Sequence, residues 1–121
     1  MKPLRLKIKS TGLENDAGAI KYLESKIPQL ERVLPKGESA VSCAVELEKT
    51  TKHHIAGKIY RAEFNVRVGK TLFRAEEIAE SIEAAIDAAK DEVKVEITKA
   101  MTKRKTVARA GAREMKRRIR E

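Results

Sequence analysis

The stretch that decides the fold of this chain is residues 60–75, YRAEFNVRVGKTLFRA. Apolar and other side chains alternate through its first nine residues, which is the pattern of a β-strand with one buried face. Gly69-Lys70 then supplies a tight turn, and a short strand follows from Thr71 to about Ala75. The stretch therefore predicts a β-hairpin.

Two more strands are predicted by the same alternation, at residues 4–9 and 41–47. The polar stretch 49–58 separates the second of these from the strand that begins at Tyr60, and it is predicted to form a long hairpin loop. Four strands in all are therefore expected.

Apolar residues recur at helical spacing in two further segments. Between residues 20 and 34 they predict a helix that Asn15 or Asp16 can cap. Pro28 is expected to kink or split this helix, because proline removes a backbone donor. Between residues 82 and 100 they predict a longer helix, and the serine directly before it is a suitable cap.

The predicted order of elements is strand, helix, three strands, helix. This order indicates an α+β fold of β-α-β-β-β-α topology, and the economical arrangement is a two-layer sandwich with a four-stranded sheet and two helices on one face. We divide the chain into an α+β domain at 1–101 and a basic arm at 102–121. The arm contains Gly111 and lacks a core, so we expect it to be disordered when free.

Positive charge is concentrated at the C-terminal end of the chain. Residues 1–98 hold 17 Lys and Arg against 16 Asp and Glu, whereas residues 99–121 hold ten against two. A cation block of this density gains most by binding a polyanion, and nucleic acid is the commonest. The arm has no aromatic residue, which favours salt-sensitive contact with phosphates over stacking on bases. A solubilising tail is the alternative.

Basic residues of the last helix are predicted to lie on both flanks of its buried stripe. A solvated face of mixed ion pairs is the alternative interpretation, but continuity with the arm favours a surface that tracks phosphates. One flank holds Lys90, Lys94 and Lys105, and the other holds Lys99 and Lys103.

The arm itself supplies further candidate phosphate ligands. Its apolar residues fall at helical spacing, so it can form an amphipathic helix when bound. The candidates are Arg104, Arg109, Arg113, Lys116, Arg117, Arg118 and Arg120. The outer face of the sheet is predicted to carry a weaker second basic surface, formed by Arg5, Lys7, Lys9, Arg61 and Arg67 and diluted by Glu46, Glu48 and Glu63.

Little in the sequence indicates catalysis, a metal or another cofactor. His53 and His54 are adjacent in the predicted loop, but a metal site needs further ligands that converge in space. Cys43 lies on the apolar face of its strand, where a thiol behaves as a small hydrophobic residue. No P-loop, dinucleotide-binding turn or nucleophile elbow is present. We therefore predict that the protein is not an enzyme and needs no cofactor.

The compartment is indicated by what the sequence lacks. A single cysteine cannot form an internal disulfide, which fits a reducing cytoplasm. No leader opens the chain, and no apolar run approaches the length of a membrane span. A soluble, cytoplasmic protein is expected.

Three segments resemble the ribosome hibernation-promoting factor family, also called ribosome-associated translation inhibitors. They are TTKHHIAGKIYRAEFNV at residues 50–66, LFRAEE at 72–77 and AAID at 84–87. The similarity runs from about residue 4 to 105. It implies a β-α-β-β-β-α fold that resembles a double-stranded-RNA-binding domain. It also implies binding in the decoding channel of the small ribosomal subunit, against rRNA, where the protein blocks tRNA and mRNA and inhibits translation in idle cells.

The resemblance also implies which residues contact rRNA, because family members use basic residues of both helices and of the C-terminal end. Carried onto this sequence, these are Lys90, Lys94, Lys99, Lys103 and Lys105, with Lys21 and Lys26 on the first helix. The sequence departs from the family pattern at Glu83, Glu92 and Val95, so the rRNA face is expected to be shifted toward the arm. The chain resembles the short form, without an added dimerisation domain, and is expected to be monomeric when free.

Two other functions remain open on the sequence. A general duplex-RNA-binding module has a similar topology, but residues 81–85 are SIEAA rather than the lysine-rich helix start that such modules use. A protein-interaction domain whose basic arm docks on an acidic partner is the other alternative.

Overall fold

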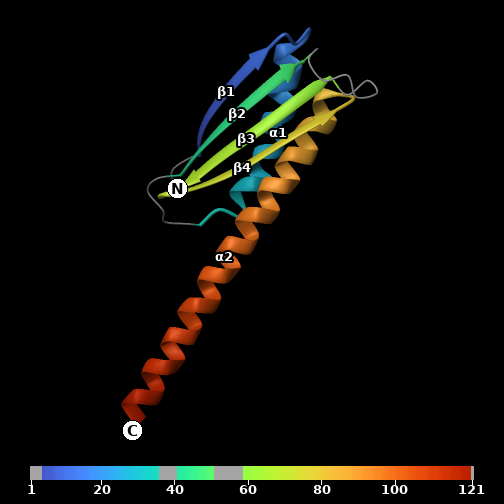
Figure 1. Cartoon of the computed structure of the whole chain (residues 1–121). Helices are drawn as coiled ribbons and strands as arrows, with labels where there is room; N and C mark the ends of the chain where they lie inside the picture. The colour runs from blue at the N-terminus through green and yellow to red at the C-terminus, as the bar shows by residue number, and fades with distance from the viewer. Residues whose placement is uncertain (1–3, 36–40, 51–58, 121) are drawn as a thin grey trace.

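A computed structural model describes residues 4–35, 41–50 and 59–120. Its elements are β1 (Arg5–Thr11), α1 (Asp16–Glu31), β2 (Val41–Lys49), β3 (Tyr60–Val68), β4 (Thr71–Ala79) and α2 (Ile82–Arg120). The strands form one sheet in the order β1-β2-β3-β4. Both helices cover the same face of the sheet and leave the other face open (Figure 1). The predicted α+β sandwich is therefore confirmed.

The direction of each strand follows from its connection. β1 pairs with β2 in parallel, and parallel neighbours need a crossover, which α1 provides. β2, β3 and β4 pair antiparallel. Gly69 has a φ of 60° in the turn between β3 and β4, a conformation that is strained for residues with a side chain. The predicted hairpin at residues 60–75 is thus confirmed.

The core lies between the sheet and the two helices. Its largest fully buried side chains include Phe64, Leu23, Leu30, Leu47, Ile86 and Ile97. Burial of each contributes about 1.5–3 kcal/mol of hydrophobic stabilisation. Cys43 belongs to the same core, and burial raises the pKa of its thiol to about 12. It therefore packs as a small hydrophobic residue.

Helix α1 is not split at Pro28, although a split is one of the two outcomes expected there. The side chain of Asn15 caps the helix, since its Oδ1 accepts a hydrogen bond from the Gly18 N–H at 3.0 Å. Pro28 lies inside the helix without splitting it, and the Arg32 N–H still donates to the Pro28 carbonyl at 3.2 Å. A proline this close to the end removes only one backbone bond, and α1 ends soon after, at Glu31.

The hairpin strands are longer than the sequence indicates. β4 continues to Ala79, whose register partner is Tyr60, rather than ending near Ala75. At the other end of β3, the Thr50 N–H donates to the Ile59 carbonyl at 2.6 Å. The predicted loop with His53 and His54 falls largely outside the described residues.

Helix α2 is the longest element and extends well beyond the sheet (Figure 1). Ser81 caps it as predicted, since its Oγ accepts a hydrogen bond from the Ala84 N–H at 3.1 Å. With 39 residues the helix is about 58 Å long. Among its residues with described side chains, Ile97 is the last that is buried, so the exposed stretch beyond it projects away from the body.

The expected boundary between domain and arm falls inside α2. In the structure residues 102–120 continue the helix without a break, in contrast to the disorder expected from the sequence. A segment that extends an existing helix bears no nucleation cost, and lysine, arginine and alanine favour helix. The division at residue 101 and the state of the arm in the free protein stay predictions.

Candidate nucleic-acid interface

The exposed cations of α2 with described side chains include Lys99 and Lys103, which lie one helical turn apart. They border a shallow hollow together with Thr98, Thr102 and Thr106. The hydroxyls of Thr98 and Thr106 donate to carbonyls of their own helix, at 2.8 and 3.0 Å. These two hydroxyls are engaged within the helix, and the lysine ammonium groups are the charged donors that this surface offers to a phosphate.

An ion pair draws Lys99 toward a carboxylate, but it is weak. The Lys99 Nζ lies 3.9 Å from Glu96 Oε1, and both side chains are largely exposed. Exposed pairs of this kind contribute little and are screened by salt. Lys99 thus remains available to a phosphate, whose charge and oxygen acceptors compete well with a single distant carboxylate.

Lys90 differs from this exposed pair because it is buried. It is only 5% exposed, and its Nζ donates to Gln29 Oε1 of α1 at 2.6 Å. The same ammonium lies 2.9 Å from Asp91 Oδ1. The sequence predicts that Lys90 lies beside Lys94 on an exposed flank of the helix. In the structure Lys90 instead lies in the contact between α1 and α2. Its part in RNA binding stays a prediction, and its visible role is to join α1 to α2.

A second polar contact between the helices involves Tyr22. Its hydroxyl donates to Asp87 Oδ2 at 2.7 Å, and this hydrogen bond is the main reason that the pKa of Tyr22 is raised. Lys26 Nζ lies 5.1 Å from the centroid of the Tyr22 ring, within cation–π range. Lys21 is exposed on the same helix. The α1 candidates thus lie beside the contact between the helices, with Lys26 held over an aromatic ring.

The remaining candidates lie along the C-terminal half of α2. Arg104 is exposed, with its Nη2 3.5 Å from Thr71 Oγ1 at the start of β4, and Arg109 is exposed farther along the helix. For the others the structure describes the course of the helix but not the side chains: Lys105, Arg113, Lys116, Arg117, Arg118 and Arg120. Their contacts stay predictions.

The open face of the sheet corrects the expectation for Arg61. The sequence predicts that this residue adds to a basic surface, but its guanidinium contacts four carboxylates. Nη1 lies 3.2 Å from Glu48 and 3.6 Å from Glu46. Nη2 lies 2.6 Å from Glu63 and 3.2 Å from Glu76. Arg61 is therefore neutralised, because the sheet register aligns these residues on neighbouring strands.

Glu63 is the centre of this network, a role that the sequence alone does not reveal. It is 8% exposed and accepts hydrogen bonds from Asn65 at 2.8 Å, Arg74 at 3.0 Å and Arg61 at 2.6 Å. The bond from Asn65 contributes most to lowering the pKa of Glu63 to about 2, with help from Arg74 and against the effect of burial. The carboxylate is therefore firmly ionised at neutral pH.

Neither a metal centre nor a membrane span is found in the described part of the chain. Over residues 4–35, 41–50 and 59–120, no group of three or more His, Cys, Asp or Glu is placed to hold a metal ion. In the same part of the chain no helix is long and apolar enough to cross a membrane.

The family of the chain follows from a comparison with family models. The model described as sigma 54 modulation protein / S30EA ribosomal protein matches residues 6–105. The chain belongs to this family. The resemblance to ribosome hibernation-promoting factors is thereby confirmed. Among curated proteins, no relative matches the chain.

Two solved structures that match the chain share its fold. The N-terminal domain of Protein Y from Thermus thermophilus superposes with a TM-score of 0.62 at 26% identity, over 81% of this chain and 98% of that domain. A ribosomal subunit interface protein from Coxiella burnetii also gives 0.62, at 12% identity over 82% and 99% of the two chains. At that identity the second match shows the fold alone.

The S30EA match ends inside α2. It includes Lys90, Lys94, Lys99, Lys103 and the flanking residues up to 105. The more distal candidates lie beyond it, namely Arg109, Arg113, Lys116, Arg117, Arg118 and Arg120. The family therefore bears on the folded body and the first half of α2, and the distal half has to be argued from its charge.

Proposed function

We propose that this protein is a ribosome hibernation factor that binds the small ribosomal subunit in the decoding channel. There it contacts rRNA, blocks the binding of tRNA and mRNA, and inhibits translation in idle cells. The observation that carries this proposal is the S30EA family match over residues 6–105. The Protein Y domain, at 26% identity over nearly its whole length, supports it.

The charge distribution supports a mechanism by occupancy. Ten Lys and Arg against two acidic residues in 99–121 can neutralise rRNA phosphates and release counterions. The folded body has a fixed shape and selects the channel, while the cationic helix supplies affinity. Such a mechanism uses no cofactor and has no turnover.

Among the described residues, Lys99 and Lys103 are the best placed to contact phosphates. Both are exposed on one stretch of α2, and the ion pair of Lys99 with Glu96 is long and solvated. Lys90 supports this surface from behind by holding α1 against α2. We therefore assign affinity to the exposed pair and positioning to the buried lysine.

The test is co-sedimentation of the full chain with purified small subunits over a series of salt concentrations, with and without competing tRNA. We expect salt-sensitive binding that tRNA displaces. A free RNA duplex is the control, because binding to it as strong as binding to small subunits would indicate a general duplex-RNA-binding module. Binding that persists at saturating tRNA contradicts occlusion of the decoding channel.

A further inference from the structure

The open face of the sheet is divided by charge. Arg5, Lys7 and Lys9 are all exposed on β1, an edge strand of the sheet. None of the ion pairs between described residues involves these three cations. The register partners of Arg5 and Lys7 are Ser42 and Ala44, whereas Lys9 lies opposite Glu46, so this edge keeps a net positive charge.

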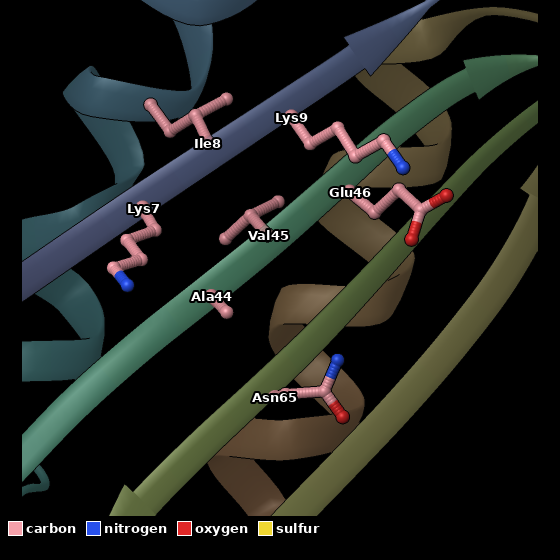
Figure 2. A pocket seen from close by; sticks show the side chains of 7 residues that line it. All are labelled: Lys7, Ile8, Lys9, Ala44, Val45, Glu46 and Asn65. Carbon is pink, nitrogen blue, oxygen red and sulfur yellow. The ribbon is translucent and has the colours of Figure 1, made fainter.

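A hollow of about 530 Å³ lies beside the two lysines. Figure 2 shows Lys7 and Lys9 on β1, Ala44 and Glu46 beside them on β2, and Asn65 farther across the sheet on β3. The hollow exists because Ala44 is short and stands between Lys7 and Asn65 in one cross-strand row. The lysines thus border an accessible depression.

The spacing of these cations suits a polyanion strand. Alternate residues of a strand are about 6.8 Å apart, which is comparable to the separation of successive phosphates along one nucleic-acid strand. Arg5, Lys7 and Lys9 are alternate residues of β1 and repeat this spacing along its exposed face. A single RNA backbone laid along β1 can therefore place one phosphate near each cation.

An acidic cluster that begins on β2, next to β1, limits the direction of such a strand. Around Arg61, four carboxylates face only two guanidinium groups, so the cluster has a net negative charge: Glu46, Glu48, Glu63 and Glu76 against Arg61 and Arg74. Phosphates that crossed the sheet would meet this charge at close range. The favourable path runs along β1.

We propose that the β1 surface, defined as Arg5, Lys7, Lys9 and the hollow over Ala44, binds the phosphate backbone of a single RNA strand. The helices lie on the opposite side of the sheet (Figure 1), and Lys99 and Lys103 belong to α2. The protein then holds two RNA segments at once, one against each layer. This inference does not depend on the decoding channel, because it concerns the backbone of any RNA.

The experiment titrates the ¹⁵N-labelled full chain with a ten-nucleotide single-stranded RNA of mixed sequence. We expect amide shifts in β1 and around Ala44 in addition to those in α2. Fluorescence anisotropy with the same RNA then compares wild type with Lys7→Gln/Lys9→Gln. The control variant is Arg32→Gln/Lys70→Gln, which removes two exposed cations away from β1. The arm is present in every variant, so its contribution cancels.

Removing two phosphate ligands should reduce the slope of log K against log[salt] by about 1.4 for a single strand. Between 50 and 200 mM salt, the affinity of the wild type then falls about sevenfold more than that of Lys7→Gln/Lys9→Gln. The control variant should keep the wild-type slope. Amide shifts confined to α1 and α2, or equal slopes in all three proteins, overturn the proposal.

A ten-residue glutamate peptide is the second ligand in the titration. Shifts in β1 with this peptide but not with RNA also overturn the proposal and assign the β1 surface to an acidic protein. This test is independent of the test of the proposed hibernation function, because it uses free RNA in place of the small subunit throughout. Either proposal can fail while the other stands.

Discussion

Glu63 shows how a single residue organises the open face of the sheet. Its carboxylate accepts hydrogen bonds from side chains of β3 and β4, including Arg61, Asn65 and Arg74. The nearly complete burial of its side chain is compensated by these three donors, two of them charged. The residue therefore converts two arginines of the sheet from free cations into structural partners, and leaves β1 as the basic edge.

Replacement Glu63→Gln should lower the free energy of unfolding by about 2 kcal/mol at pH 7, since hydrogen bonds to charged groups are removed. The folded pKa of about 2 lies below the usual 4.5. The stabilisation is therefore present above pH 4.5 and is lost as the pH falls toward 2. Chemical denaturation should show that the difference in free energy of unfolding between wild type and Glu63→Gln is smaller at pH 3 than at pH 7. A difference that does not change with pH contradicts the role assigned to the Glu63 carboxylate. Glu24→Gln, on the exposed face of α1, is the control.

Substitution of Lys90 should affect stability, whereas substitution of Lys99 and Lys103 should affect binding. Lys90→Met removes the bond to Gln29 and should lower the free energy of unfolding by about 1–2 kcal/mol. It should leave small-subunit binding nearly unchanged at temperatures where the variant is folded. Lys99→Gln/Lys103→Gln should leave thermal unfolding unchanged and reduce the salt slope by about 1.8. Thermal denaturation and co-sedimentation of both variants check this, and the reverse pattern would show that the roles are exchanged.

At the scale of elements, the sequence predicts the strands and helices well because each has one buried face. It misses the last residues of β4, where Glu76 and Glu77 obscure the alternation. The neutralisation of Arg61 depends on the register of three strands, and the burial of Lys90 depends on where α1 meets α2. Neither follows from the spacing of residues along the chain. The surface predicted from sequence therefore includes two residues, Arg61 and Lys90, whose charged groups contact other parts of the protein in the fold.

The helix content of the C-terminal half of α2 can be changed by substitution at Gly111. A Cβ at Gly111 meets no atom within 4 Å, so Gly111→Ala fits, and alanine favours helix over glycine by about 1 kcal/mol. Gly111→Ala should raise the circular dichroism signal of helix at 222 nm, and Gly111→Pro should lower it. Equal signals in both variants and wild type would show that the arm is disordered in the free protein, as the sequence alone predicts.

At the scale of the whole molecule, fold and charge are separated along the chain. The buried core ends at Ile97, and the half-buried Ala100 and Met101 are the last described residues packed against it. Beyond them, residues 102–121 hold nine Lys and Arg against two Glu. The body can therefore keep its shape while the distal helix provides most of the net charge, so the two contributions to binding can be removed independently.

Truncation after Ala100 tests this separation directly. The shortened chain keeps every described residue of the buried core, so its thermal unfolding should remain cooperative, with a modest decrease in midpoint because Met101 is removed. Its binding to small subunits should be markedly weaker and less dependent on salt. Each phosphate of duplex rRNA that the truncated protein no longer neutralises lowers the slope by about 0.9, so the difference in slope measures how many phosphates the arm neutralises.

A full-length chain with the Lys and Arg of residues 102–121 replaced by Gln is the matched control, because it keeps the length and removes the charge. If charge alone matters, it should behave as the truncated protein does. Stronger binding than the truncation would show that the distal helix also contributes by shape. Unchanged affinity and slope in both variants would remove the arm from the mechanism and leave the folded body as the whole of the interface.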